Sequence, residues 1–247
     1  PSPALPAGAS CRVAWRASGG AVEESTFAVA PEAAGAPAVA LYDRGDPLAI
    51  APFPDDFWLE DDASQPSGRK VSIPTPPFTE GLQLQAFTAL AGLTSLNDGW
   101  SRQTPIVIAL SHPLDPSLVP ADPFEAQDPF SPIALVDIDP ESPDFGQRVP
   151  YRLLLRSDPR PGGAVDHAAI LFPTIDLRER GRYAVVFTRR AFAAGEAGRG
   201  FGPSALFAAA AAPPVDGESA VTTRVRAAVG DALDTVAALG DVPSPRE

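Results

Sequence analysis

The residues best suited to acid–base or nucleophilic chemistry are the two histidines, His112 and His167. Ser111 precedes the first and Asp166 precedes the second. Neighbouring residues on a strand point to opposite faces of a sheet, so neither pair forms a ready catalytic dyad. A cross-strand arrangement of Ser111, His167 and an aspartate stays open as an alternative. We interpret both histidines as surface or turn residues.

None of the short motifs that mark a complete hydrolytic or cofactor site occurs in the chain. Gly202-Pro-Ser204 and Gly217-Glu-Ser219 begin like the nucleophile elbow Gly-x-Ser-x-Gly but lack its second glycine. There is no His-Glu-x-x-His, no cysteine pair for zinc, and no glycine loop for a phosphate or a dinucleotide. We therefore assign no catalytic, cofactor-binding or metal-binding residue, and leave open whether this chain is itself an enzyme.

Two acidic stretches contain the carboxylates that Ca²⁺ prefers as ligands. Glu60-Asp61-Asp62 follows an aromatic segment, and Asp137-Ile-Asp139-Pro-Glu141 begins like an EF-hand loop. The second stretch lacks the glycine at position 6 and the distal glutamate of such a loop. We interpret it as a solvated turn and keep Ca²⁺ binding as the alternative for both stretches; no other cofactor is expected.

The charge balance is acidic, with 31 Asp and Glu against 19 Lys and Arg, a net charge of −12. Nucleic-acid binding needs clustered basic residues, so with this charge balance we do not expect the chain to bind nucleic acid. No apolar run approaches the roughly 20 residues that span a bilayer. Cys11 is the only cysteine, which leaves a free thiol in a loose tail or, as the alternative, a lipid-anchored cysteine. The absence of methionine suggests a removed leader or a segment of a longer protein.

The elements that must position any site lie in residues 105–190. Five short apolar runs, over residues 105–110, 132–138, 149–155, 168–172 and 182–188, alternate with turn residues. Thirty prolines favour turns and edge strands over a helical bundle. The pattern predicts a mainly β fold, an Ig-like antiparallel β-sandwich with an extended N-terminal strap and a C-terminal amphipathic helix.

We divide the chain into four parts on this basis. Residues 1–38 form a tail or strap, and residues 39–104 form a lead-in segment packed on the sandwich, with a short helix over 79–93. The sandwich itself covers residues 105–212. Residues 213–247 contain a helix over 216–239 and a linker. This helix has one apolar face, with Gly240 as its C-cap.

Several segments resemble the N-terminal region of large secreted bacterial lipases and esterases, in which an Ig-like domain precedes an α/β-hydrolase domain. They are Pro52-Phe-Pro-Asp-Asp-Phe57, Leu96-Asn-Asp-Gly-Trp-Ser101, the stretch over 105–118 with Ser-His-Pro-Leu-Asp-Pro-Ser-Leu, and Gly181-Arg-Tyr-Ala-Val-Val-Phe-Thr188. The resemblance covers roughly residues 40–240. The nucleophile, acid and catalytic histidine of the family have no positions in this sequence, so none is transferred.

The resemblance implies a non-catalytic portion of a secreted or cell-envelope carboxylic-ester or polyester hydrolase. Its expected partner is an α/β-hydrolase domain or chain of the same parent protein, which it would brace. Candidate docking residues are aromatic or lie on the helix face: Phe53, Phe57, Trp58, Trp100, Val225, Val229 and Val236. The competing interpretation of each is burial in this domain's own core. The alternative function is a stand-alone binding or adhesion module of a cell envelope.

Overall fold

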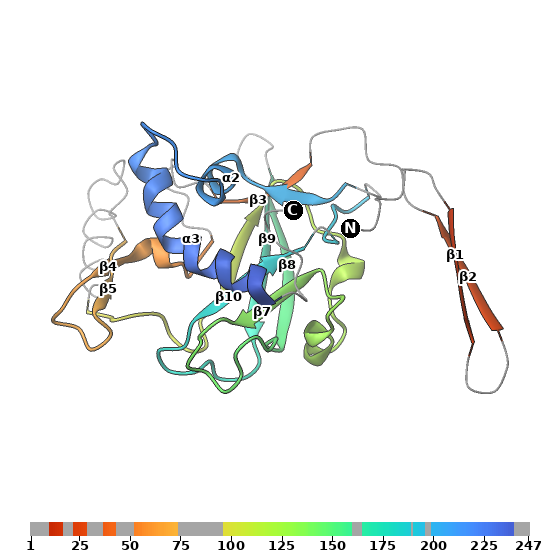
Figure 1. The fold of residues 1–247 in the computed structure, drawn as a ribbon, viewed down its shortest axis with the longest axis horizontal. Helices are drawn as coiled ribbons and strands as arrows, with labels where there is room; N and C mark the ends of the chain where they lie inside the picture. The colour runs from red at the N-terminus through yellow and green to blue at the C-terminus, as the bar shows by residue number, and fades with distance from the viewer. Residues whose placement is uncertain are drawn as a thin grey trace.

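The computed structural model (Figure 1) describes the backbone of residues 10–16 and 22–28, and residues 37–42, 52–73, 96–159, 165–188, 190–195 and 199–239 in full. These residues form mainly β-strands in several sheets, with two α-helices near the C-terminal end. The predicted mainly β class is therefore confirmed. The helix predicted over residues 79–93 and the cap at Gly240 lie outside the described residues.

A five-stranded sheet forms the centre of the molecule. Its order is β11 (Phe201–Pro203), β3 (Ala38–Leu41), β6 (Ile106–Leu110), β9 (Val165–Pro173) and β8 (Tyr151–Pro159). All neighbours are antiparallel except β11 and β3, which are parallel. The strands predicted over 105–110, 149–155 and 168–172 are confirmed as β6, β8 and β9.

Alternation along β6 decides which face of this sheet is buried. Ile106, Ile108 and Leu110 are buried while the residues between them are partly exposed. In the ladder with β9, Ile106 lies opposite Leu171 and Ile108 opposite Ala169, both buried. Because side chains on a strand alternate between faces, this one row of apolar residues makes one face the core face.

A second, two-stranded sheet pairs β7 (Ile133–Asp137) with β10 (Tyr183–Phe187) in antiparallel register. Every residue of β7 is buried, so this strand is covered on both faces. Ile133 and Leu135 join the core cluster that contains the β6 and β9 residues. Ala134 and Val136 belong to another cluster on the opposite side. The second sheet is therefore the middle layer between the five-stranded sheet and the C-terminal helix.

That helix is α3 (Ala220–Leu239), drawn in dark blue across β7 and β10 in Figure 1. Val236 packs against Ala134 and Val136, while Val225 packs in a third cluster near the helix start. The predicted start at residue 216 is wrong by four residues: the hydroxyl of Ser219 accepts a hydrogen bond from the amide of Thr222 at 3.1 Å, as an N-cap does. No described helix is long and apolar enough to cross a membrane.

Shorter elements complete the fold. The second helix, α2 (Ala205–Ala211), lies beside α3 and was not predicted. Strands β4 (Leu59–Asp61) and β5 (Arg69–Val71) form one hairpin; β1 (Ser10–Arg16) and β2 (Val22–Ala28) form another that joins no other strand of the described residues. Three short 3₁₀ helices are η1 (Asp56–Trp58), η2 (Pro116–Leu118) and η3 (Pro123–Gln127). At η2, Asp115 caps the turn as predicted.

Candidate functional site

Both histidines form a hydrogen bond with a serine, and both lie at the same end of the five-stranded sheet. Ser111 Oγ lies 2.8 Å from His112 Nδ1, and Ser157 Oγ lies 2.8 Å from His167 Nδ1. The register brings the ends together, because Leu110 of β6 is directly opposite His167 of β9. The sequence argument against Ser111–His112 contact was wrong, because β6 ends at Leu110 and the two residues do not lie on a strand.

Ser111 also has a structural role that the sequence does not reveal. The hydroxyl oxygen of Ser111 accepts a hydrogen bond from the backbone amide of Val39 at 2.8 Å, and the amide of Ser111 donates to the carbonyl of Val39 at 2.9 Å. These bonds fasten β3 to the end of β6. Ser157 was missed as a histidine partner, since it sits ten residues away on the neighbouring strand. No described hydrogen bond or ion pair connects a carboxylate to His112, so a relay of Ser, His and acid is not assembled there.

Two of the three carboxylates in the stretch from Asp137 to Glu141 are buried and only Glu141 is exposed, which corrects its interpretation as a solvated turn. Asp137 is 3% exposed and Asp139 is 7% exposed. Asp137 accepts hydrogen bonds from the Asp139 amide at 2.9 Å and the Ser142 hydroxyl at 2.7 Å. Asp139 accepts from the Glu141 amide at 3.0 Å and forms an ion pair with Arg178. The carboxylates are satisfied by the protein itself, as buried charges must be.

The other acidic stretch lies beside basic residues. Glu60 faces Arg224 of α3 at 3.8 Å, and Asp62 faces Lys70 at 3.4 Å. The hydroxyl and amide of Ser64 lower the pKa of Asp62 through hydrogen bonds. Within the described residues, no group of three or more His, Cys, Asp or Glu side chains converges as a metal site. Calcium binding stays a prediction.

Four of the candidate docking residues belong to one aromatic cluster beside α3. Phe57 and Trp58 are buried and meet edge to face at 5.1 Å between ring centroids. Phe53 and Trp100 are partly buried and meet in the same way at 5.0 Å. Tyr42 joins them, and its hydroxyl donates to Asp55 Oδ1 at 2.7 Å.

Helix α3 packs against this cluster. Val225 is fully buried in it, and Val229 is partly buried. The guanidinium of Arg224 lies 4.8 Å from the ring centre of Phe57 and donates to the Phe57 carbonyl at 3.1 Å. Val236, the last candidate docking residue, is buried in the cluster under the other end of the helix. All seven side chains thus have partners inside this chain; their role in docking a second domain stays a prediction.

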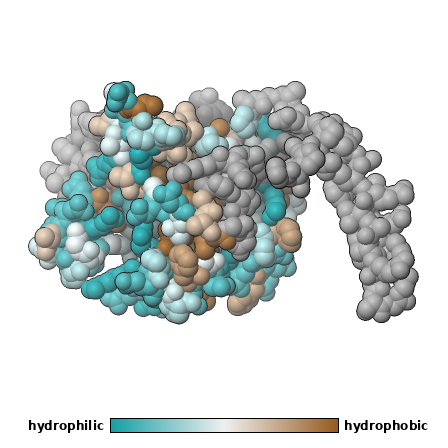
Figure 2. All heavy atoms as spheres, viewed as in Figure 1, coloured by the Kyte–Doolittle hydropathy of each residue, from teal (hydrophilic) through white to brown (hydrophobic). Residues whose placement is uncertain are grey.

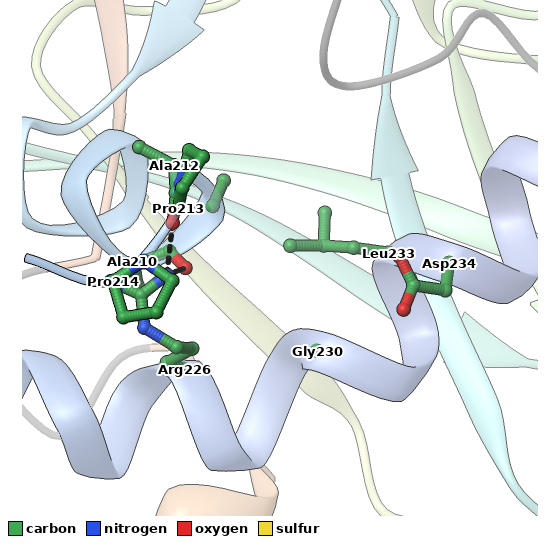
Figure 3. Close-up of a pocket in the computed structure, with 9 residues that line it drawn as sticks. Ala210, Ala212, Pro213, Pro214, Arg226, Gly230, Leu233 and Asp234 are labelled. Atoms are coloured by element: carbon green, nitrogen blue, oxygen red, sulfur yellow. Dashed lines mark hydrogen bonds between the residues drawn. The ribbon is translucent and has the colours of Figure 1, made fainter.

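A cleft of about 370 Å³ separates α2 from α3. Figure 3 shows Arg226 of α3 reaching toward the residues that end α2. Its guanidinium donates to the carbonyl oxygens of Ala209, Ala210 and Ala212, which are left without helical partners at the end of α2. The same group pairs with Glu218 at 2.5 Å, and this hydrogen bond lowers the pKa of Glu218.

The polar groups of this cleft serve to join α2 to α3. Its remaining walls are small or apolar side chains, including Pro213, Pro214 and Leu233, with Asp234 at one end. The positive charge of Arg226 is already matched by Glu218 and by the carbonyl oxygens, so the cleft offers no unmatched cation for an anionic ligand. On the face of the molecule that carries α3, apolar side chains are interleaved with hydrophilic ones (Figure 2).

Comparison of the chain with protein-family models, with curated proteins and with solved structures finds no match.

Proposed function

We propose that this chain is an Ig-like β-sandwich that serves as the non-catalytic N-terminal portion of a secreted bacterial lipase or esterase. Its two facing sheets share one core cluster, which is the arrangement that a sandwich requires. Its function would be to brace an α/β-hydrolase part of the same parent protein, which carries the ester-cleaving residues. The two sheets and α3 supply a rigid body for that purpose.

One observation carries the proposal: segments of the resemblance that are far apart in sequence meet in space. Phe53, from the Pro52-Phe-Pro-Asp-Asp-Phe57 segment, exchanges backbone hydrogen bonds with Val107 of β6 at 2.9 and 2.6 Å. Its ring contacts Trp100, from the Leu96–Ser101 motif, at 5.0 Å. Residues shared with a family for a structural reason are expected to pack together in this way.

The chemistry at the sheet end supports a non-catalytic role. Ser111, the serine best placed beside a histidine, is occupied in joining β3 to β6. A nucleophile needs a base that is oriented by a third group and an oxyanion hole nearby. The described contacts of Ser111 and His112 supply the serine and the imidazole without an orienting carboxylate.

The intact mass of the native protein, read together with the coding frame past Glu247, tests the proposal. A frame that continues into an ester-hydrolase domain, or a hydrolase chain that copurifies, is the expected result. A frame that stops at Glu247 with no copurifying chain would refute it and favour the stand-alone envelope-binding module.

An esterase assay tests the non-catalytic part separately. The chain alone, incubated with a p-nitrophenyl ester, is expected to release nitrophenol at the rate of buffer. Turnover that disappears in Ser111→Ala, His112→Ala or His167→Ala would overturn the assignment. The matched control is Ser64→Ala, which removes a hydroxyl that is far from both histidines in sequence and donates to Asp62.

A further inference from the structure

Strand β8 leaves one side of the five-stranded sheet open. It is the last strand in the order, with β9 on one side only. The amide of Thr174 donates to the carbonyl of Pro150 at 3.1 Å, and these residues continue the register in which Tyr151 lies opposite Pro173. Hydrogen-bonded pairs alternate along an antiparallel ladder, so the even-numbered residues of β8 bond to β9.

The odd-numbered residues therefore point their backbone groups away from the sheet. For Leu153, Leu155 and Ser157, no backbone hydrogen bond from the described residues reaches this free side. The strand is nine residues long. η3 lies close to it, and Gln127 of η3 donates to the carbonyl of Arg148, three residues before the strand begins. Such an edge is a template for pairing with another strand.

The side chains on the outer face of β8 show which strand would fit. In order they are Arg152, Leu154, Arg156 and Asp158. Arg156 Nε lies 2.5 Å from Asp158 Oδ2, so this pair is already formed within the strand. Arg152 is exposed and has no ion pair within the described residues, and Leu154 is 50% exposed. The strand carries an unmatched cation at one end and a carboxylate at the other.

We propose that β8 pairs antiparallel with β8 of a second copy of this chain, around a two-fold axis at Leu155, so that the two five-stranded sheets become one. In this register Arg152 lies directly opposite the partner's Asp158, and the symmetry makes the pair twice. Leu154 lies opposite the partner's Arg156, whose aliphatic stem covers the exposed leucine. Directly opposite residues of unlike charge stabilise such a ladder.

Neighbouring registers are unfavourable, which makes the pairing specific. An axis at Leu154 would place Arg152 opposite the partner's Arg156. An axis at Arg156 would place the two copies of Arg156 against each other. An axis at Ser157 would place Arg156 opposite the partner's Asp158, but these two residues already form an ion pair within each strand. Registers that place the axis between residues would join the core face of one sheet to the outer face of the other. The axis at Leu155 keeps matching faces and gives Arg152 a carboxylate opposite to it.

The net charge of −12 opposes association of two copies in general, so the attraction must come from this local match.

Sedimentation equilibrium over a concentration series that reaches the sub-millimolar range tests the proposal. The unmodified chain is expected to show a monomer–dimer equilibrium. Arg152→Asp and Asp158→Arg each turn two attractive pairs into repulsive ones, and should raise the dimer dissociation constant by about tenfold or more. The double variant Arg152→Asp/Asp158→Arg restores opposite charges and should recover dimerisation. Arg180→Asp, an equal charge change at an exposed loop residue, is the control.

A backbone variant tests the strand pairing itself. Ser157→Pro removes an amide on the free side of β8 and should weaken the dimer, whereas Ser157→Ala keeps the amide and should not. Far-UV circular dichroism checks that both variants keep their strands. A chain that stays monomeric at every concentration overturns the proposal. So does a dimer that survives both single charge reversals, because its interface then lies elsewhere.

Discussion

Phe53 and Val107 exchange both of their backbone hydrogen bonds, although 52–73 and 96–159 are separate described stretches of the chain. Phe53 lies on the same side of β6 as β3, because β3 pairs with Ala109 and Leu110 farther along that strand. The lead-in segment therefore pairs with β6 and extends the five-stranded sheet there. Its aromatic residues are positioned by backbone pairing as well as by burial.

The ring of Phe53 should contribute to stability through its contact with Trp100. Phe53→Ala keeps the backbone bridge but removes the ring, and is expected to lower the free energy of unfolding by about 2 kcal/mol. Urea denaturation followed by tryptophan fluorescence measures the change. Phe124→Ala is the control, because Phe124 is 66% exposed and its loss should cost under about 0.5 kcal/mol. Equal effects of the two variants would contradict the packing described for Phe53.

Trp100 offers a separate test, because its indole Nε1 is buried and has no hydrogen-bond partner among the described residues. Trp100→Phe removes this polar group and keeps an aromatic ring, so we expect a change within about 1 kcal/mol. Trp100→Ala also removes the packing and should cost about 3 kcal/mol. Thermal unfolding of the two variants distinguishes the contributions. A large loss in Trp100→Phe would show that the indole nitrogen has a partner in solution.

Glu218 should make the junction of α2 and α3 sensitive to acid. The hydrogen bond from Arg226 lowers the pKa of Glu218 in the folded chain. A lowered pKa stabilises the fold above the ordinary value of about 4.3 and loses that contribution as the pH falls through the lowered value. Glu218→Gln should therefore be less stable than the unmodified chain at pH 7, and the difference should vanish in acid.

Urea denaturation at a series of pH values measures this difference. Glu179→Gln, at an exposed loop residue, is the matched control and should leave the pH profile unchanged. If the free energy of unfolding still differs between Glu218→Gln and the unmodified chain at the lowest pH, the result would contradict the ion pair.

Tyr151 should make the folded chain lose stability at alkaline pH, whereas Glu218 does so in acid. Burial raises the pKa of Tyr151 to about 12, and its hydroxyl donates to the carbonyl of Ile133 at 2.8 Å. A raised pKa gives stability that is complete below the ordinary value of about 10 and is lost as the pH rises through 12. Tyr151→Phe should lose about 1 kcal/mol at neutral pH for the missing hydrogen bond.

Ultraviolet absorbance of tyrosinate follows this ionisation directly. Part of the tyrosinate signal of the unmodified chain should appear late, with unfolding. Tyr151→Phe should lose the contribution of one tyrosine, while Tyr183, whose pKa is also raised by burial, keeps a late contribution. The difference in unfolding free energy between the two chains should close as the pH rises above 10, because Tyr151 then releases a proton when the unmodified chain unfolds. A normal titration of all tyrosines would contradict the burial of Tyr151.

Strands β6, β7, β8, β9 and β10 could be predicted because their signal is local. Ile106, Ile108 and Leu110 alternate with less buried residues, and prolines bound the runs. Asp115 with Pro116 predicted a short turn for the same reason. Helix α2 also had a local signal that went unused: Ser204 caps it by accepting from the Phe207 amide, and Pro213 follows its end.

What could not be predicted depends on partners distant in sequence. The buried carboxylate of Asp139 is paired with Arg178, which comes from the loop after β9. The parallel pairing of β11 with β3 joins Phe201 to Ala38, and nothing in either segment indicates the other. The contact of Ser157 with His167 follows from the β8–β9 register, which the sequence leaves undetermined.

Helix α3 connects two clusters that share no residue: Val225 belongs to one and Val236 to the other. A helix of 20 residues is about 30 Å long and bends little over that length. It therefore connects the packing of the lead-in segment to that of the β7–β10 sheet. A displacement of α3 at one end also moves the side chains that pack at its other end, so the stabilities of the two clusters are coupled.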